Sequence, residues 1–294
     1  MLKMENRQRI AIVTGANKGI GLAISRKLSE NGTLVVLTAR DEVRGQAAVK
    51  KLQDVGVKDV VFHQLDISDP ASITSLKEFV KINFGKLDIL VNNAGVGGVE
   101  LRSPTTLIEG DSESLFAAIN ETYEMSKDCI DINYYGTKAM CEAFIPLLHQ
   151  SKSPRIVNVS ATFGKLRFIP GDSIRKELQN IDNLVEERLE ELMESFLVDC
   201  KEGRLKENGW PDRTFSAYKV SKNAVNAYTR ILAKNYPKFI VNCVCPGFVK
   251  TDLTYNTGTL TAEEGAKGPV MLALLPDGSP SGQFYNQTEP TSFE

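Results

Sequence analysis

A glycine-rich loop near the amino terminus constrains the fold of this chain more than any other feature. The loop spans Thr14–Gly21 (TGANKGIG); it follows the apolar run Ile10–Val13 and precedes a segment of helical periodicity. Glycines at a strand-to-helix junction let the chain turn tightly and bring backbone N–H groups toward a phosphate at the amino end of the helix. The loop therefore predicts a βα unit that binds a dinucleotide through Gly15, Asn17, Lys18, Gly19, Ile20 and Gly21.

Strand-like and helix-like segments alternate along most of the 294 residues. Nearly continuous apolar runs predict strands at residues 10–13, 34–38, 60–65, 87–92, 156–160 and 240–244. Helical periodicity predicts helices near residues 20–31, 44–54, 71–84, 121–149 and 217–235. This alternation is typical of right-handed βαβ units, so we expect an α/β fold with a doubly wound, mostly parallel, Rossmann-like sheet. No internal repeat or low-complexity linker divides the chain, which predicts a single domain over residues 1–294.

Two segments interrupt the alternation, at about residues 98–123 and 164–215. In the second, leucines and a phenylalanine recur at helical spacing, and Asn183 with Glu186 forms a candidate capping box. We therefore expect an inserted helix before residue 216. Both segments follow strand ends, where open α/β sheets bind their ligands, so both are expected to wall the substrate pocket.

Composition excludes several classes of function. The 35 basic and 37 acidic residues nearly cancel, so no strong field attracts nucleic acid. No apolar run reaches the roughly 20 residues that span a bilayer, and the polar amino terminus does not resemble a secretory signal. Five cysteines without a CxxC pair predict reduced thiols in a cytoplasmic protein. The two histidines are far apart and lack ligand spacing, so no metal is expected.

The end of the second strand bears on the choice of dinucleotide. It reads Leu37-Thr38-Ala39-Arg40, without the acidic residue that usually binds the ribose 2′-hydroxyl of NAD. Arg40 can accommodate a 2′-phosphate, and Lys18 adds a second cation within reach. This pattern predicts NADP(H) as the cofactor. The alternative is an ordinary surface pair of Arg40 with the adjacent Asp41.

Four motifs at strand ends and one on a predicted helix carry a resemblance to a known family. They are the loop TGANKGIG, Asp66, Asn92-Asn93-Ala94-Gly95, Tyr218-x-x-x-Lys222 and Pro246-Gly247. In this order they resemble the short-chain dehydrogenase/reductase family over nearly the whole chain. The long insertion and the phrases LTARD, NGWP and VNCVCPG are similar to the monomeric carbonyl reductases and, more closely, to a plant subgroup of that family.

The resemblance implies further cofactor contacts and an oligomeric state. Asp66 and Ile67 are expected at the adenine, and Asn93, Ala94 and Gly95 along the cofactor. Pro246 and Gly247 belong to the same site, with Val249 and Thr251 near the nicotinamide amide and the phosphates. The insertion is expected to occupy the face through which many members of the family pair, so the chain is expected to be a monomer.

Tyr218 and Lys222 have the chemistry that a carbonyl reductase needs. Reduction of a ketone leaves an alkoxide that needs a proton, and the ordinary tyrosine pKa near 10 is too high for easy proton exchange near neutrality. A lysine four residues along the helix lies on the same face and stabilises the phenolate. Both residues are also expected to contact the cofactor. Asn133 matches the family asparagine that kinks its helix and holds a water beside the lysine, although it could serve the kink alone.

The fifth predicted strand departs from the family pattern. The family usually ends it with Asn-Val-Ser-Ser, whereas this chain reads Asn158-Val159-Ser160-Ala161-Thr162. Ala161 stands where the second serine donates to the substrate oxygen, a bond whose loss lowers kcat by about 10² to 10³. Three explanations compete: an engineered substitution, a replacement donor in Thr162, or an enzyme with weaker oxyanion support or a different reaction. Thr162 and Ser160 both point to the opposite face of a regular strand.

The two interrupting segments supply the apolar side chains Phe163, Leu166, Phe168, Ile169, Trp210 and Phe215. They predict a small apolar substrate, such as a terpenoid or alkaloid ketone, reduced to a secondary alcohol or formed in the reverse direction. Two alternatives stay open. One is reduction of an activated C=C bond, and the other is an NADPH-binding protein of low or no activity. Tyr218 and Lys222 argue against the second alternative.

Overall fold

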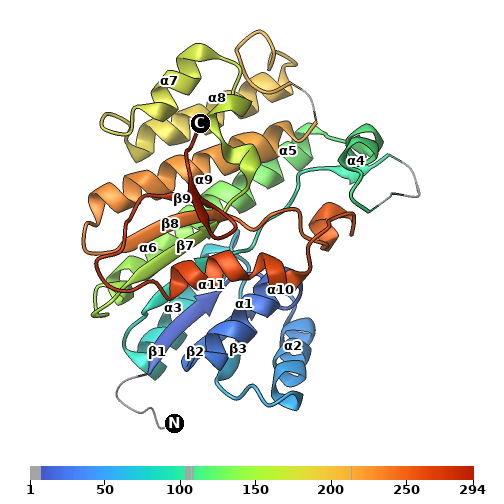
Figure 1. Ribbon diagram of the computed structural model, residues 1–294. Coiled ribbons are helices and arrows are strands. Elements are labelled where there is room, and N and C mark those ends of the chain that lie inside the picture. The colour runs from blue at the N-terminus through green and yellow to red at the C-terminus, as the bar shows by residue number, and fades with distance from the viewer. Residues whose placement is uncertain (1–7, 103–106, 108, 213) are drawn as a thin grey trace.

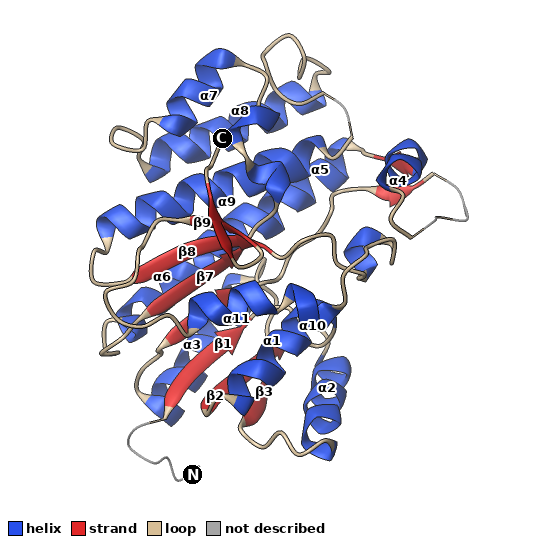
Figure 2. Cartoon of the chain, in the orientation of Figure 1, coloured by secondary structure: helices blue, strands red, loops and turns tan. Residues whose placement is uncertain are grey.

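The computed structural model describes residues 8–102, 107, 109–212 and 214–294. Expectations for residues 1–7, 103–106, 108 and 213 lie outside the described residues. The described chain contains a central eight-stranded sheet in the order β10-β9-β8-β7-β4-β1-β2-β3, parallel except for β10 (Figures 1 and 2). The strands are β1 (Arg9–Val13), β2 (Thr33–Ala39), β3 (Val60–Gln64), β4 (Ile89–Asn92), β7 (Arg155–Val159), β8 (Ile240–Cys245), β9 (Phe284–Asn286) and β10 (Glu289–Thr291). The doubly wound α/β prediction is confirmed.

Helices cover both faces of the sheet because successive strand residues point to opposite faces. Ile10, Ile12 and Val36 pack toward α3, α6 and α9, while Ala11 and Val13 pack toward α1, α2 and α11. The helices on the two faces are α1 (Gly19–Glu30), α2 (Glu42–Asp54), α3 (Pro70–Phe84), α5 (Tyr123–Ile130), α6 (Thr137–Leu148), α9 (Ser216–Asn235), α10 (Ala262–Gly265) and α11 (Lys267–Ala273). The sheet is therefore buried on both sides, which explains its nearly continuous apolar strands.

The predicted helix over residues 121–149 is interrupted. A π-helix at Asp131–Gly136 separates α5 from α6, so the helical hydrogen-bond register shifts by one residue in its middle. Apolar periodicity continues through such a bulge, which is why the sequence predicts one helix. The pattern also missed the short elements β5 (Glu100–Leu101), α4 (Ser112–Ala118) and β6 (Ile119–Asn120), as well as α10, α11 and the β9–β10 hairpin.

The segment before residue 216 contains two helices where one was predicted. They are α7 (Asp172–Gln179) and α8 (Glu186–Lys201), and α8 packs on α5 and α9 on the side away from the sheet (Figure 1). The predicted capping box is wrong. The N-cap of α8 is Val185, without a side-chain bond, and the Asn183 amide donates to Asn180 Oδ1 at 3.1 Å. Apolar packing against the rest of the chain, rather than a polar cap, therefore stabilises α8.

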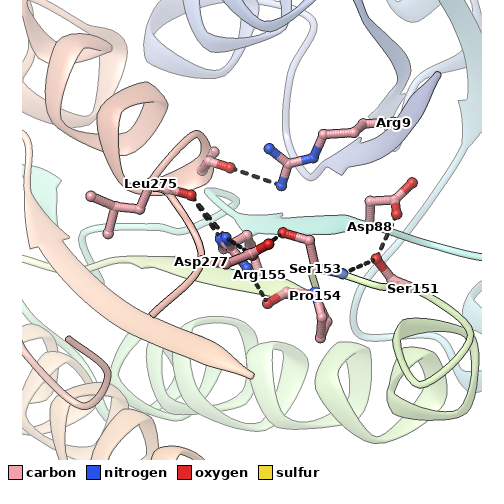
Figure 3. A network of polar contacts seen from close by, with 9 residues as sticks. Arg9, Asp88, Ser151, Ser153, Pro154, Arg155, Leu275 and Asp277 are labelled. Atoms are coloured by element: carbon pink, nitrogen blue, oxygen red, sulfur yellow. Dashed lines mark hydrogen bonds and ion pairs between the residues drawn. The ribbon is translucent and has the colours of Figure 1, made fainter. Parts of the chain in front are cut away.

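A polar network connects the amino ends of the central strands (Figure 3). Asp88 Oδ2 accepts from Ile10 N at 2.8 Å, and Asp88 Oδ1 accepts from the Ser151 hydroxyl at 2.5 Å. Arg155, 2% exposed, donates to Leu275 O and to the Asp277 carboxylate, each at 2.8 Å. These bonds tie the starts of β1, β4 and β7 together, so the opposite ends of the same strands are held at fixed spacing.

Candidate active site

A cavity of about 640 Å³ opens at the carboxyl ends of β1, β2 and β4. The chain winds outward in both directions from β1 and β4, and this switch point is where open α/β sheets bind ligands. Thirteen of the predicted cofactor residues line the cavity: Gly15, Asn17, Lys18, Gly19, Ile20, Gly21, Arg40, Asp66, Ile67, Asn93, Ala94, Gly95 and Thr251. Residues far apart in the sequence thus form one wall.

The glycine loop is packed so closely that side chains do not fit. A Cβ atom on Gly21 would lie 2.5 Å from Asn93 Nδ2, and one on Gly15 would lie 3.0 Å from Ala94 Cα. Gly15 also has a φ of 61°, in the left-handed region that favours glycine. The Thr14 hydroxyl accepts from the backbone N–H groups of Asn93 and Ala94, both at 2.9 Å. The loops after β1 and β4 therefore hold one another in position.

The amino end of α1 is suited to a phosphate. Its N-cap, Lys18, has extended backbone and makes no side-chain bond to the first turn, and Gly19 has a φ of 54°. The first N–H groups of a helix lack intrahelical partners and carry partial positive charge, so they favour an anion. With the cavity volume and the close-packed glycines, these features fit the pyrophosphate of a dinucleotide.

Lys18, Arg40 and Arg44 are three of the cationic side chains that line the cavity. Arg40 is exposed, and Arg44 lines the cavity beside it although the sequence analysis missed it. Asp41 accepts from Arg44 N at 2.9 Å and pairs with the Arg44 side chain, so it is the cap of α2 rather than the partner of Arg40. Lys18 forms an exposed ion pair with Asp252. Helical spacing from the strand end, Arg40 to Arg44, was the signal that could have found the third cation.

Asp66 lies at the end of β3 with its carboxylate fixed in a turn. Its Oδ1 accepts from Ser68 N at 2.9 Å and from the Ser68 hydroxyl at 2.6 Å. Burial raises the pKa of Asp66, but these two bonds and the charge of Arg40 outweigh burial and lower it. The residue is therefore ionised near neutrality, with a fixed orientation at the cavity wall.

Helix α9 brings Tyr218 and Lys222 together under the loop after β7. The Lys222 ammonium lies 5.7 Å from the Tyr218 ring centroid and donates to Val159 O at 2.9 Å. Burial lowers the pKa of Lys222 to about 8 and raises that of Tyr218. A Cβ atom on Gly95 would lie 3.5 Å from Lys222 Nζ, so the lysine adjoins the wall of the cavity.

Asn133 lies in the π-helix and joins three elements. Its Oδ1 accepts from Val96 N at 2.9 Å, and its Nδ2 donates to Val96 O at 2.9 Å and to the Ser221 hydroxyl at 3.0 Å. Ser221 in turn donates to Tyr218 O at 2.9 Å. Asn133 therefore connects the loop after β4 with the helix that carries the tyrosine and lysine.

The position expected to face the substrate oxygen is Ala161, directly after β7. The Thr162 hydroxyl contacts Cys245 Sγ at 3.3 Å, and Ser160 is 2% exposed with its hydroxyl 3.4 Å from Lys222 O. Both neighbouring hydroxyls thus already have partners. Among Ser160, Thr162 and Tyr218, the tyrosine is therefore the residue suited to act as a general acid.

An aromatic cluster covers Tyr218. The ring of Phe215 lies 6.0 Å from that of Tyr218, and the ring of Phe163 lies 6.4 Å from it. Phe116, from the first interrupting segment, packs against both phenylalanines. The rest of the predicted wall is divided: Phe168 contacts Phe163, whereas three residues are buried in the core because α7 and α8 cover them, namely Leu166, Ile169 and Trp210.

Comparison with known proteins identifies the family. The profile of the short chain dehydrogenase family matches residues 9–171 and 208–260. The chain belongs to the short-chain dehydrogenase/reductase family. The unmatched stretch, residues 172–207, contains α7 and α8. Membership makes the chain an oxidoreductase that acts on a CH–OH or C=O group and uses a nicotinamide cofactor.

Individual relatives resemble the chain over its full length. The (+)-neomenthol dehydrogenase of Arabidopsis thaliana is 52% identical, over 98% of this chain and 99% of that protein. The structure of salutaridine reductase from Papaver somniferum matches with a TM-score of 0.88 and 46% identity, over 95% of this chain and 99% of that one. Carbonyl reductase [NADPH] 3 of Mus musculus is 40% identical, over 96% of this chain and 97% of that protein.

Several predicted site residues of this dehydrogenase/reductase do not line the cavity. Tyr218, Lys222, Asn133, Ala161 and Thr162 are not lining residues, although Asn133 binds the lining residue Val96, Lys222 adjoins the lining residue Gly95, and Tyr218 packs in the aromatic cluster. The loop after β8 also contributes no lining residue before Lys250; the predicted residues there are Pro246, Gly247 and Val249. Val249 is 2% exposed and packs against Gly265, so it supports the wall from behind.

A second group of lining residues was not predicted from the sequence and includes Val99, Tyr255 and Asn256. The Tyr255 hydroxyl donates to Val99 O at 2.9 Å, so the loop after β8 contacts the first interrupting segment. Among the described residues no helix is both long and apolar enough to cross a bilayer. That part of the chain also has no group of three His, Cys, Asp or Glu side chains suited to a metal ion.

Proposed function

We propose that this enzyme reduces a small apolar ketone to a secondary alcohol with NADPH, or carries out the reverse oxidation, with Tyr218 as the acid/base. The observation that carries the proposal is the placement of Tyr218 over Lys222, between the dinucleotide cavity and an aromatic cluster. A bound NADPH would supply the hydride. The residues of the chain then have to orient the ketone, exclude water and deliver one proton.

Proton delivery is derived from the geometry of α9. Tyr218 donates its phenolic proton to the carbonyl oxygen as negative charge develops there. Burial alone opposes ionisation of Tyr218, so a nearby positive charge is needed, and the buried Lys222 ammonium provides it. Asn133, held by Val96 and Ser221, keeps α9 in register with the loop after β4. We assign two roles to Asn133: it shapes the π-helix, and it holds a water beside Lys222 through which a proton is relayed.

We assign the cofactor as NADP(H) rather than NAD(H). The cations Arg40, Arg44 and Lys18 in the cavity wall support a 2′-phosphate, and the acidic side chain at the tip of β2, Asp41, is engaged as the cap of α2. The experiment compares kcat/KM for NADPH and NADH. We expect a preference for NADPH of at least about 100-fold that falls about tenfold in Arg40→Ala. Equal use of the two cofactors would refute the assignment.

The substrate class rests on the aromatic cluster and on the relatives. Phe116, Phe163 and Phe215 offer apolar contact area, with Tyr218 as the polar group among them. Two of the relatives act on a menthol-type terpenoid and on salutaridine, as their names state. We propose a terpenoid or alkaloid ketone. Turnover of a monocyclic terpenoid ketone panel, with the alcohols identified by chromatography, is the direct test.

Ala161 defines a second experiment. If the missing serine limits the reaction, Ala161→Ser raises kcat by about 10². The control is Ala161→Gly, which alters the same position without adding a donor. An unchanged or lower kcat in the serine variant would show that this enzyme does not rely on a second donor to the carbonyl oxygen.

The absence of a donor at Ala161 also favours one other reaction, reduction of an activated C=C bond. That reaction depends less on hydrogen bonds around a carbonyl oxygen. An enone substrate separates the two: an allylic alcohol as product supports the carbonyl reduction, and a saturated ketone supports the C=C reduction.

We further propose a monomer that works in the cytoplasm, without membrane or nucleic-acid partners. Support comes from α8, which covers the faces of α5 and α9 beside the site. The near balance of charge and the free cysteines agree with this assignment. Light scattering with a mass near 32.4 kDa, independent of concentration, is the expected result. A stable dimer would contradict it.

A further inference from the structure

Helix α9 begins without a cap of its own. The residue before it, Phe215, has a φ of 61° and a ψ of 35°, and its side chain offers no hydrogen-bond acceptor. Ser, Thr, Asp and Asn are the usual residues at this position because their oxygens accept from the first N–H groups. Here the position is occupied by a ring that packs against Tyr218. The first turn of α9 therefore needs an acceptor from another part of the chain.

Glu121 supplies that acceptor. Its Oε2 accepts from Ser216 N at 3.0 Å, and its Oε1 accepts from Ala217 N at 2.8 Å. Both oxygens of one carboxylate thus bind the amino end of the helix, where a negative charge is stabilised by the helix dipole. Burial lowers the pKa of Lys219, in the same turn, and the charge of Glu121 opposes this lowering. Glu121 is half-buried, and the two backbone N–H groups that it binds directly precede Tyr218 in the chain.

The neighbouring residue caps the other helix of the site. The Thr122 hydroxyl accepts from Met125 N at 3.3 Å and starts α5, which leads into the π-helix that contains Asn133. Glu121 and Thr122 directly follow β6, and β6 pairs with β5, which begins directly after the lining residue Val99. One dipeptide therefore connects the pocket wall with both helices that carry the proposed proton machinery.

We propose that Glu121 is a positioning residue for the reaction. Its carboxylate closes the first turn of α9 and fixes Tyr218 relative to the pocket wall. Tyr218 is the third residue of the helix and lies in the turn that Glu121 holds, whereas Lys222 lies one turn farther on and is held by Val159 O. Loss of the carboxylate displaces the tyrosine and leaves the lysine in place. The assignment rests on the proposed role of Tyr218 as the acid.

The test compares Glu121→Ala and Glu121→Gln with the control Glu124→Ala in the full-length chain. Glu124 is exposed in the first turn of α5, so its replacement removes the same charge nearby without touching α9. For Glu121→Ala we expect kcat to fall about tenfold or more, with the Kd for NADPH within about twofold of the wild type. Glu121→Gln keeps one oxygen as an acceptor and is expected to lose about threefold. Glu124→Ala is expected to match the wild type.

Hydrogen exchange gives a readout that does not depend on turnover. Backbone amides in a peptide covering residues 214–220 are expected to exchange on the order of tenfold faster in Glu121→Ala, whereas amides of the second and third turns of α9 keep their protection. If Glu121→Ala does not fold, the split between kcat and the NADPH Kd in Glu121→Gln decides the question.

Three outcomes would overturn the assignment. They are a wild-type kcat in Glu121→Ala, unchanged exchange in the first turn, and a parallel loss of kcat, NADPH binding and melting temperature, which indicates general loosening. Failure of the proposed function looks different. In that case the wild type itself turns over no ketone or alcohol, while the exchange experiment still reports whether Glu121 holds the first turn.

Discussion

At the amino ends of the strands the buried Arg155 guanidinium donates to two backbone carbonyls and a carboxylate (Figure 3). At the carboxyl ends the buried Lys222 ammonium donates to one carbonyl, Val159 O. Arg155 is 2% exposed and Lys222 5% exposed, so burial is similar and the number of partners is not. A buried charge with several partners is a structural element, while one with few is held at a cost.

The two ends of the strands therefore differ in role: the amino ends maintain the fold, and the carboxyl ends hold the groups that carry out the chemistry. Burial lowers the pKa of Lys222 to about 8, close to neutrality, where small changes in surroundings shift its charge. The network around Arg155 and Asp88 ties three strand starts together, and the loops at the other ends of these strands line or adjoin the site. The hydrogen bonds at the amino ends of the strands thus offset the unfavourable burial of Lys222 at the carboxyl ends.

The largest effect is expected from Tyr218→Phe. This change removes only the hydroxyl, so kcat/KM for ketone reduction should fall about 10³-fold, because no other group at the site delivers the proton. Stability and NADPH binding should stay close to the wild type. Steady-state kinetics with a fluorescence titration of NADPH checks both. A fall of less than tenfold would mean that the proton comes from another donor.

Arg155→Met tests the network at the amino ends of the strands. The change removes four hydrogen bonds from a buried guanidinium to Leu275 O, Pro154 O and the Asp277 carboxylate, so the free energy of unfolding should fall by about 3–4 kcal/mol. The folded fraction should keep its kcat, because the network lies at the far ends of the strands. Urea unfolding and kinetics on the same samples measure the two effects. Loss of kcat with normal stability would contradict this division of roles between the two ends of the strands.

Lys222→Met should make the protein more stable although inactive. The folded pKa of about 8 lies below the ordinary value of about 10.4, so the unfolded chain binds the proton more tightly and burial of the ammonium costs stability below pH 8. The cost decreases as the pH rises from 8 and disappears above about 10.4. After the loss of the bond to Val159 O is subtracted, we expect a gain of about 2 kcal/mol at pH 7 and a loss of up to about 1 kcal/mol near pH 10.5. Unfolding without nucleotide at both pH values measures the difference, and a gain that is equal at both would exclude the ionisation as its cause.

Motifs that act through the backbone were predictable from the sequence. Gly15 and residues 17–21 and 93–95 line the cavity, and the sequence indicates these positions because glycine spacing and strand ends are local features. The parallel sheet follows from the apolar runs for the same reason. The cap of α9 by Glu121 was not predictable, since it joins residues 95 positions apart in the chain. The π-helix around Asn133 was also hidden, because a bulge preserves apolar periodicity.

The side chains of the pocket wall were predictable in part. Phe163 and Phe215 contact Tyr218, whereas Trp210 is buried beneath α8 and donates to Asp199 at 3.0 Å. Composition marks such residues as apolar and does not distinguish a wall from a core. That choice depends on how α7 and α8 pack, which is set by long-range contacts.

Asp277→Asn gives the smallest expected effect and separates the components of the Arg155 network. Bonds from the Ser153 hydroxyl and from Arg155 lower the pKa of the exposed Asp277 carboxyl. Since its folded pKa is below the unfolded value, its contribution to stability is present near neutrality and is lost as the pH falls through the folded pKa. The melting temperature of the variant should therefore lie slightly below that of the wild type at pH 7, and the difference should shrink as the pH falls through the folded pKa of Asp277. A loss as large as that of Arg155→Met would mean that the carboxylate, and not the carbonyls of Leu275 and Pro154, holds the guanidinium.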